Sequence, residues 1–230
     1  MPKLYHHPLC PHSRFVRLVL AEHNIEAELV EERVFDRRRE FLVLDPAGQT
    51  PVLLEDDGRV IPGAGPIAEY IDETCGEALG AHRLLPSSPA ERVEVRRLLG
   101  WFNQKFHAEV TQYLVTEKVY KRVMSPAQGG GPPDSDAVRA ARNNMRYHMS
   151  YMGYLLHNQN WLGGDRLTLA DLAAAAHLSC ADFLGDAPWH EDESVKQWYA
   201  TMKSRPSFRS LLADRLMGLQ PGPAYANLDF

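Results

Sequence analysis

The sequence predicts an α/β domain followed by an all-helical domain. Up to about residue 80, short strand-like runs alternate with helix-like runs in the order β-α-β-α-β-β-α. A stretch rich in proline and serine, residues 84–90, follows as a linker, and beyond it the apolar residues recur at helical spacing. We place the α/β domain at residues 1–80, the helical domain at 81–217 and an extended tail at 218–230.

Each element of the first domain has its own signal. Residues 3–5 and 28–34 read as strands, and residues 13–23 carry an apolar helical stripe. Residues 37–44 form a short helix closed by the turn 45–48. Two further short strands flank the acidic turn 56–58, and a helix over 65–74 ends the domain. The pattern therefore predicts four strands and three helices.

The helical domain begins with Ser88 as an N-cap and Pro89 in the first turn. Long helices are predicted over residues 92–114 and 137–156, separated by the Gly- and Pro-rich loop 129–134. Thr168-x-x-Asp171 resembles a capping box at the start of the next helix, with Asp in place of the usual Glu.

Composition excludes several classes of function. The chain has 230 residues, 44% of them hydrophobic, and a formal net charge of −5, so general affinity for nucleic acid is not expected. We expect no membrane span and no secretory segment. Three cysteines far apart in the sequence indicate a reducing cytoplasm rather than a disulfide framework.

Residues 48–54 and 60–71, together with residues 161–172, resemble the glutathione S-transferase family over nearly the whole chain. The resemblance implies a thioredoxin-like N-terminal domain with a mixed four-stranded sheet, a C-terminal helical bundle and a homodimer. It also implies a cis peptide between Thr50 and Pro51, with the backbone of Thr50 pairing with glutathione.

The carboxylate clamp of that family is altered. Where the family typically carries Glu-Ser, this chain has Gly63 and Ala64. The lost hydroxyl donor to the γ-glutamyl carboxylate is worth roughly 1.5–3 kcal/mol, or one to two decades of affinity. The resemblance therefore implies a degenerate glutathione pocket and weak or absent glutathione binding; its residues are Cys10, Ser13, Thr50, Pro51, Gly63 and Ala64.

The loop before the first helix carries the activating residue in this family. Cys10 at a helix N-terminus suits a thiolate, and Ser13 could instead donate to a glutathione thiolate. The alternative is that Cys10 is a small packing residue and Ser13 a helix cap. A metal site at His6, His7, Cys10 and His12 is not expected, because adjacent strand residues point to opposite faces.

Two further segments are candidates for partner binding. Arg37, Arg38 and Arg39 form a basic run that is either a solvated face or a docking patch for an acidic protein segment. In the tail, the apolar and acidic anchors either fold back over the domain or bind a partner, and we expect the second; they are Tyr225, Leu228, Asp229 and Phe230.

The chain also resembles a bacterial branch of the family, the division proteins that bind FtsZ, the tubulin-like division GTPase. The resemblance is one of the whole sequence, with the Gly63-Ala64 replacement, the loop 129–133 and the Pro-rich tail 218–230 as matching features. That similarity implies a non-enzymatic adaptor that needs no cofactor, binds FtsZ filaments at midcell and regulates constriction. The alternative is a glutathione S-transferase or thiol transferase that uses glutathione with Cys10 or Ser13.

Overall fold

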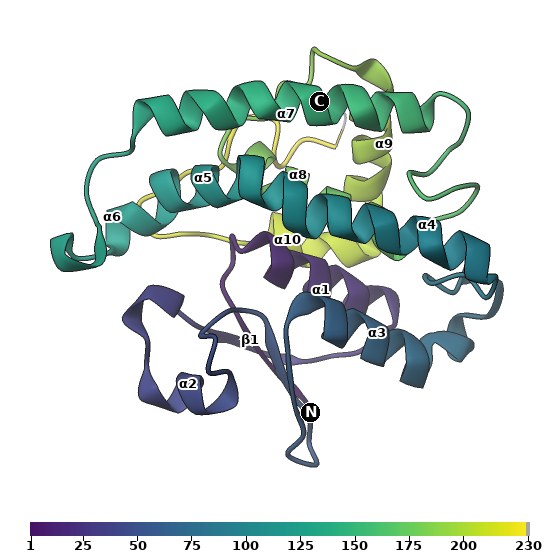
Figure 1. Cartoon of the computed structure of the whole chain (residues 1–230), viewed down its shortest axis with the longest axis horizontal. Coiled ribbons are helices and arrows are strands. Elements are labelled where there is room, and N and C mark those ends of the chain that lie inside the picture. The colour runs from purple at the N-terminus through teal and green to yellow at the C-terminus, as the bar shows by residue number, and fades with distance from the viewer. Residues whose placement is uncertain (229–230) are drawn as a thin grey trace.

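The computed structural model describes residues 1–228 (Figure 1). The N-terminal domain is built on a four-stranded sheet in the order β2-β1-β3-β4. β1 pairs in parallel with β2 and antiparallel with β3, which pairs antiparallel with β4. This confirms the mixed sheet expected from the sequence. The strands are β1 (Lys3–His6), β2 (Glu28–Glu31), β3 (Val52–Leu54) and β4 (Val60–Pro62).

Two helices of this domain, α1 (Pro11–Glu22) and α3 (Ala64–Cys75), lie between the sheet and the helical domain in Figure 1, whereas α2 (Arg39–Leu44) lies apart from them. The strand predicted over residues 28–34 is shorter than expected. It ends at Glu31, and the chain turns through a 3₁₀ segment, Val34–Asp36. Glu32, the first residue after the strand, is buried, and its carboxylate pairs with Arg38.

The helical domain has two long rods, one above the other in Figure 1, with the remaining helices behind them. The first rod extends well beyond the predicted 92–114, because wide π-type turns at Trp101–Thr111 and Thr116–Tyr120 continue the helix. In chain order the helices are α4 (Pro89–Gly100), α5 (Gln112–Val115), α6 (Lys121–Val123), α7 (Ser135–Leu156), α8 (Leu169–Phe183), α9 (Glu193–Ser204) and α10 (Arg209–Leu212).

Helix α8 is buried along its whole length and packs against α1, so it joins the two domains. Its N-terminus confirms the predicted capping box. The backbone N–H of Thr168 donates to Asp171 Oδ2 at 3.0 Å, and the Thr168 hydroxyl donates to the same oxygen at 2.9 Å. Oδ1 of Asp171 accepts from the Leu162 N–H and the Trp198 indole. The box therefore also fixes the loop before α8 and helix α9.

The C-terminal segment is not extended. The N–H groups of Tyr225 and Asn227 bond back to the carbonyls of Gly222 and Ala224, which closes turns over residues 222–227. Tyr225 is fully buried, and its hydroxyl donates to Leu211 O at 2.6 Å. Expecting Tyr225 as an exposed docking anchor was therefore wrong, because its ring fills the core under α1 and α8. Leu228 is 42% exposed, and Asp229 and Phe230 lie outside the described residues.

No helix within residues 1–228 is both long and apolar enough to cross a lipid bilayer.

Candidate functional site

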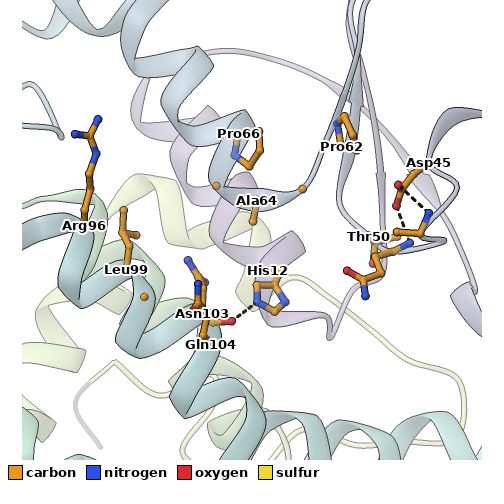
Figure 2. Close-up of a pocket in the computed structure, with 15 residues that line it drawn as sticks. His12, Asp45, Thr50, Pro62, Ala64, Pro66, Arg96, Leu99, Asn103 and Gln104 are labelled. Atoms are coloured by element: carbon orange, nitrogen blue, oxygen red, sulfur yellow. Dashed lines mark hydrogen bonds between the residues drawn. The ribbon is translucent and has the colours of Figure 1, made fainter.

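A cleft between the two domains contains two adjoining cavities of about 620 and 540 Å³. Figure 2 shows the larger one, with α3 and the loop before β3 facing the first long helical rod. The two cavities share four lining residues, so they form one site: His12, Gln49, Thr50 and Asn103.

The wall before β3 is held by a tight turn. Asp45 is buried, and its carboxylate accepts from the backbone N–H groups of Ala47 at 3.1 Å and Gln49 at 2.9 Å (Figure 2). The Thr50–Pro51 peptide bond is cis, as the resemblance implied. Thr50 lines the cleft, and the resemblance implies that its backbone pairs with glutathione there.

The N-terminus of α3, where the altered clamp lies, forms the next part of the same wall, and the first helical rod faces both. Gly63 has a φ of 90°, a backbone conformation that favours glycine. The Ala64 methyl group faces the cleft in Figure 2 and donates no hydrogen bond. Pro66, the third helical residue, has no N–H, so only the amides of Ala64 and Gly65 remain as unpaired donors of the first turn. This helix end is a weaker anion site than an ordinary one, and the residues present fit the glutathione carboxylate poorly.

Cys10 and Ser13 separate into different roles. Cys10 is the N-cap of α1 and lines the smaller cavity, where its thiol donates to Thr50 O at 3.6 Å. Ser13 is fully buried, and its Oγ accepts from the His7 N–H at 3.4 Å. Ser13 therefore faces the protein interior, and Cys10 is the member of the pair that meets the cleft.

The thiol of Cys10 is acidified by its surroundings. Burial by itself raises its pKa. Interactions with the side chains of His12 and Ser13 and with Thr50 lower it by more than burial raises it, and the result is a pKa of about 7. The pKa of His12 is raised in turn. Burial lowers it, but the Cys10 thiol and the Asn103 carbonyl raise it more. The two groups therefore stabilise each other in their charged forms.

Sequence reasoning missed the polar network behind this pair. His12 Nε2 bonds to Asn103 O at 2.8 Å (Figure 2), and the Asn103 side-chain oxygen lies 3.2 Å from His177 Nε2. Thr111 Oγ1 bridges His177 Nδ1 at 2.9 Å and His107 Nδ1 at 3.1 Å. Residues 103, 107 and 111 are four apart, one face of a helix, which is a signal that the sequence did contain.

The three arginines of the basic run, residues 37–39, do not all make the same contacts. All three arginines are exposed, and Arg38 also donates from Nε to both oxygens of Glu32 at 3.2 Å. The Glu32 side chain is wholly buried, so Arg38 neutralises an interior carboxylate. Arg38 therefore has a structural contact besides its place in the expected docking patch, which stays a prediction for all three residues.

The sequence and the fold have relatives among known proteins. Two family models match: the N-terminal domain of glutathione S-transferases at residues 4–78, and their C-terminal domain at residues 122–206. FtsZ-localized protein A of Caulobacter vibrioides is 44% identical over 99% of this chain and 97% of its own length.

Solved structures agree with these matches. A glutathione S-transferase of Sinorhizobium meliloti shares 50% identity over the whole of both chains, with a TM-score of 0.98. The crystal structure of FzlA from C. crescentus shares 44% identity over 100% of this chain and 99% of its own, with a TM-score of 0.91.

Proposed function

Because the chain belongs to the glutathione S-transferase family, and a relative that matches it end to end is an FtsZ-localized protein, we propose that it associates with FtsZ filaments and regulates bacterial division. It acts there as an adaptor in the cytoplasm at midcell. Its effect on the filaments comes from protein–protein contact and not from glutathione conjugation.

The altered clamp is the structural observation that carries the non-enzymatic part of this proposal. Ala64 replaces a hydroxyl donor and Pro66 removes one amide donor, both at the helix end where a carboxylate would bind. Thr50 and its cis peptide keep the shape of the cleft. A cleft that keeps its shape but lacks donors for the carboxylate supports retention of the fold for a use other than glutathione chemistry.

A homodimer gives the adaptor a mechanism. Two identical subunits related by a two-fold axis carry two identical docking surfaces. One dimer then bridges two filaments, and its avidity exceeds the affinity of either site. Bundling or bending of filaments follows from this arrangement, and a monomeric variant loses it.

Co-sedimentation with polymerised FtsZ tests the proposal. We expect the protein to pellet with GTP-assembled filaments and to remain in the supernatant with unassembled FtsZ. Calorimetry with glutathione, run in parallel, is expected to show weak or no binding. Failure to pellet at any protein concentration contradicts the FtsZ association, and micromolar glutathione affinity favours the transferase alternative. Of the two candidate residues in that alternative, Cys10 is the one that lines the cleft, because Ser13 is fully buried.

A further inference from the structure

We propose that the free edge of β2 binds an extended basic segment of another protein. The segment adds a fifth strand to the sheet and places one aliphatic side chain in a notch beside α1. This surface is separate from the cleft between the domains, because none of the residues that line the notch lines either cleft cavity. The inference goes beyond the proposed association with FtsZ and does not rest on it.

β2 is an outer strand of the sheet, so one of its two edges is open. The N–H groups of Glu28 and Glu32 donate to carbonyls in and beside β1. Backbone groups of successive strand residues point to opposite sides, so those of Leu29 and Glu31 point away from β1. Within residues 1–228, neither of these two amides donates a hydrogen bond. A chain that lies along this edge therefore meets free backbone donors and acceptors.

A notch of about 170 Å³ lies beside this edge, between β2, α1 and α10. Leu29, which is 45% exposed, forms one side of it. Arg17 also lines the notch, but its Nη1 and Nη2 already bond to Asp214 and to Ser210 O. Because drug-sized ligands need pockets of about 300–1,000 Å³, the notch suits a single aliphatic side chain rather than a free ligand. The other apolar residues that line it are Leu20, Ala21, Ile25 and Ala27.

The pleat of the sheet connects the open edge with the notch. Leu29 is in register with Leu4, which is buried in the core that α1 shares, so Leu29 and Glu31 lie on the α1 face of the sheet. Glu28 lies on the other face. A strand that pairs with β2 places every second side chain on the α1 face. The notch receives the side chain opposite Leu29, and the next residues on either side pass the glutamates.

The charges along this edge select the occupant. Glu26, Glu28 and Glu31 are exposed, and no basic residue lies between positions 26 and 31. Lys3 lies 3.3 Å from Glu28, and within residues 1–228 this is the only ion pair of the three carboxylates. Opposite charges on paired strands stabilise the pairing and like charges oppose it. A second copy of this edge would set glutamate against glutamate, whereas lysines or arginines around one aliphatic residue match both the charges and the notch.

Binding of a synthetic peptide tests the proposal. The probe is the heptapeptide TKTLKTK, acetylated and amidated at its ends. In antiparallel pairing with its leucine opposite Leu29, its three lysines lie opposite Glu26, Glu28 and Glu31. Exchange of the β2 amides with solvent is followed by NMR of the isotope-labelled full chain. In the free protein we expect fast exchange at Leu29 and Glu31 and slow exchange at Val30, and the peptide should slow exchange at the first two.

Variants separate the contributions of charge and notch. Glu26→Lys with Glu31→Lys should weaken binding of TKTLKTK about tenfold, because two attractive cross-strand pairs become repulsive. Glu73→Lys with Glu77→Lys is the matched control, since both residues are exposed and the net charge changes equally. Ala21→Leu, which fills the notch from α1 without changing any charge, should also weaken binding. The peptide TETLETE, with glutamates in place of the lysines, should bind the wild type at least about tenfold more weakly.

The wild-type measurements decide even if a variant fails to fold. No binding of TKTLKTK at about 1 mM overturns the proposal, and so does binding that leaves the Leu29 and Glu31 amides unprotected. Equal binding of TETLETE overturns the choice of a basic occupant. Protection of both amides that rises with protein concentration, without peptide, identifies a second copy as the occupant and also overturns the proposal. FtsZ is absent from these measurements, so failure of this proposal and failure of the FtsZ association are seen separately.

Discussion

The aromatic ring of Tyr225, in the C-terminal segment, lies against the guanidinium of Arg14 in the first helix, with 5.7 Å between Arg14 Cζ and the ring centroid. Arg14 is fully buried, donates from Nε to Pro8 O at 2.7 Å, and pairs through Nη2 with Asp214 at 3.1 Å. Its charge is thus compensated by groups from both ends of the chain. Pro8 is two residues before Cys10, so the C-terminal segment supports the loop that carries Cys10.

The buried position of Tyr225 predicts a large stability effect. Tyr225→Ala empties a site in the core, and we expect the free energy of unfolding to fall by about 3–5 kcal/mol. Tyr225→Phe keeps the ring but leaves Leu211 O without its donor, with an expected loss of about 1–3 kcal/mol. Urea denaturation followed by circular dichroism measures both.

Leu228→Ala is the matched control, because this residue is in the same segment but is exposed, and its effect should stay within about 0.5 kcal/mol. Equal stability of Tyr225→Ala and wild type would show that the segment is detached in solution. By the same reasoning, deleting residues 224–230 should lower the melting temperature, the opposite of what a free docking peptide predicts.

The sequence predicted the fold because local and long-range signals agreed. The apolar stripe of the first helix, the Thr168–Asp171 box and the Thr50–Pro51 step each appear at the expected place. It did not predict the fate of the C-terminal segment. Prolines and a glycine are compatible with both extended and turn conformations, and burial of Tyr225 depends on Arg14 and Phe183, far away in sequence.

The candidate site was predicted only in part. Adjacent arginines look equivalent in a sequence, yet only Arg38 meets a buried carboxylate, since that contact depends on the turn after β2. Cys10 and Ser13 were likewise indistinguishable until the first turn of α1 placed one in the cleft and the other inside. The contact of Asn103 with His12 was missed because it uses the backbone carbonyl, which any residue has, although the helical spacing of residues 103, 107 and 111 was present in the sequence.

The basic patch predicts a charge-dependent contact, and Arg37 and Arg39 test it without disturbing the Arg38–Glu32 pair. Arg37→Glu with Arg39→Glu should weaken FtsZ co-sedimentation, and binding of the wild type should weaken with salt. Unfolding free energy should change by no more than about 0.5 kcal/mol. Arg38→Glu should instead lower the free energy of unfolding clearly, because it leaves the buried Glu32 carboxylate without its partner. Unaltered pelleting of the double variant across salt concentrations removes this patch from the model.

The clamp predicts a gain of function by a single substitution. Ala64→Ser returns a hydroxyl to the cleft wall, and we expect glutathione affinity to rise about tenfold, as one charge-assisted hydrogen bond allows. Gly63 is left unchanged, because its φ of 90° strains any side chain. Calorimetry compares this variant with Ala64→Gly, which alters size without adding a donor. Equal affinities would show that Pro66 or the cavity shape, and not the missing hydroxyl, limits binding.

Burial of His7 predicts loss of stability in acid. Burial, and then the positive charges of His6 and Arg14, lower its pKa from 6.5 to about 4. Between these two pH values the unfolded chain therefore binds a proton that the folded chain does not. The contribution of neutral His7 to the free energy of unfolding is complete above about pH 6.5 and is lost as the pH falls towards 4.

His7→Asn tests this. Asn does not titrate, and its Oδ1 can replace Nδ1 as the acceptor of the Leu9 N–H. Between about pH 7 and pH 5, we expect this variant to lose about 2 kcal/mol less unfolding free energy than wild type, as one proton per molecule requires. Urea titrations at both pH values measure the difference, and equal losses in the two proteins would mean that His7 is already protonated in the folded state.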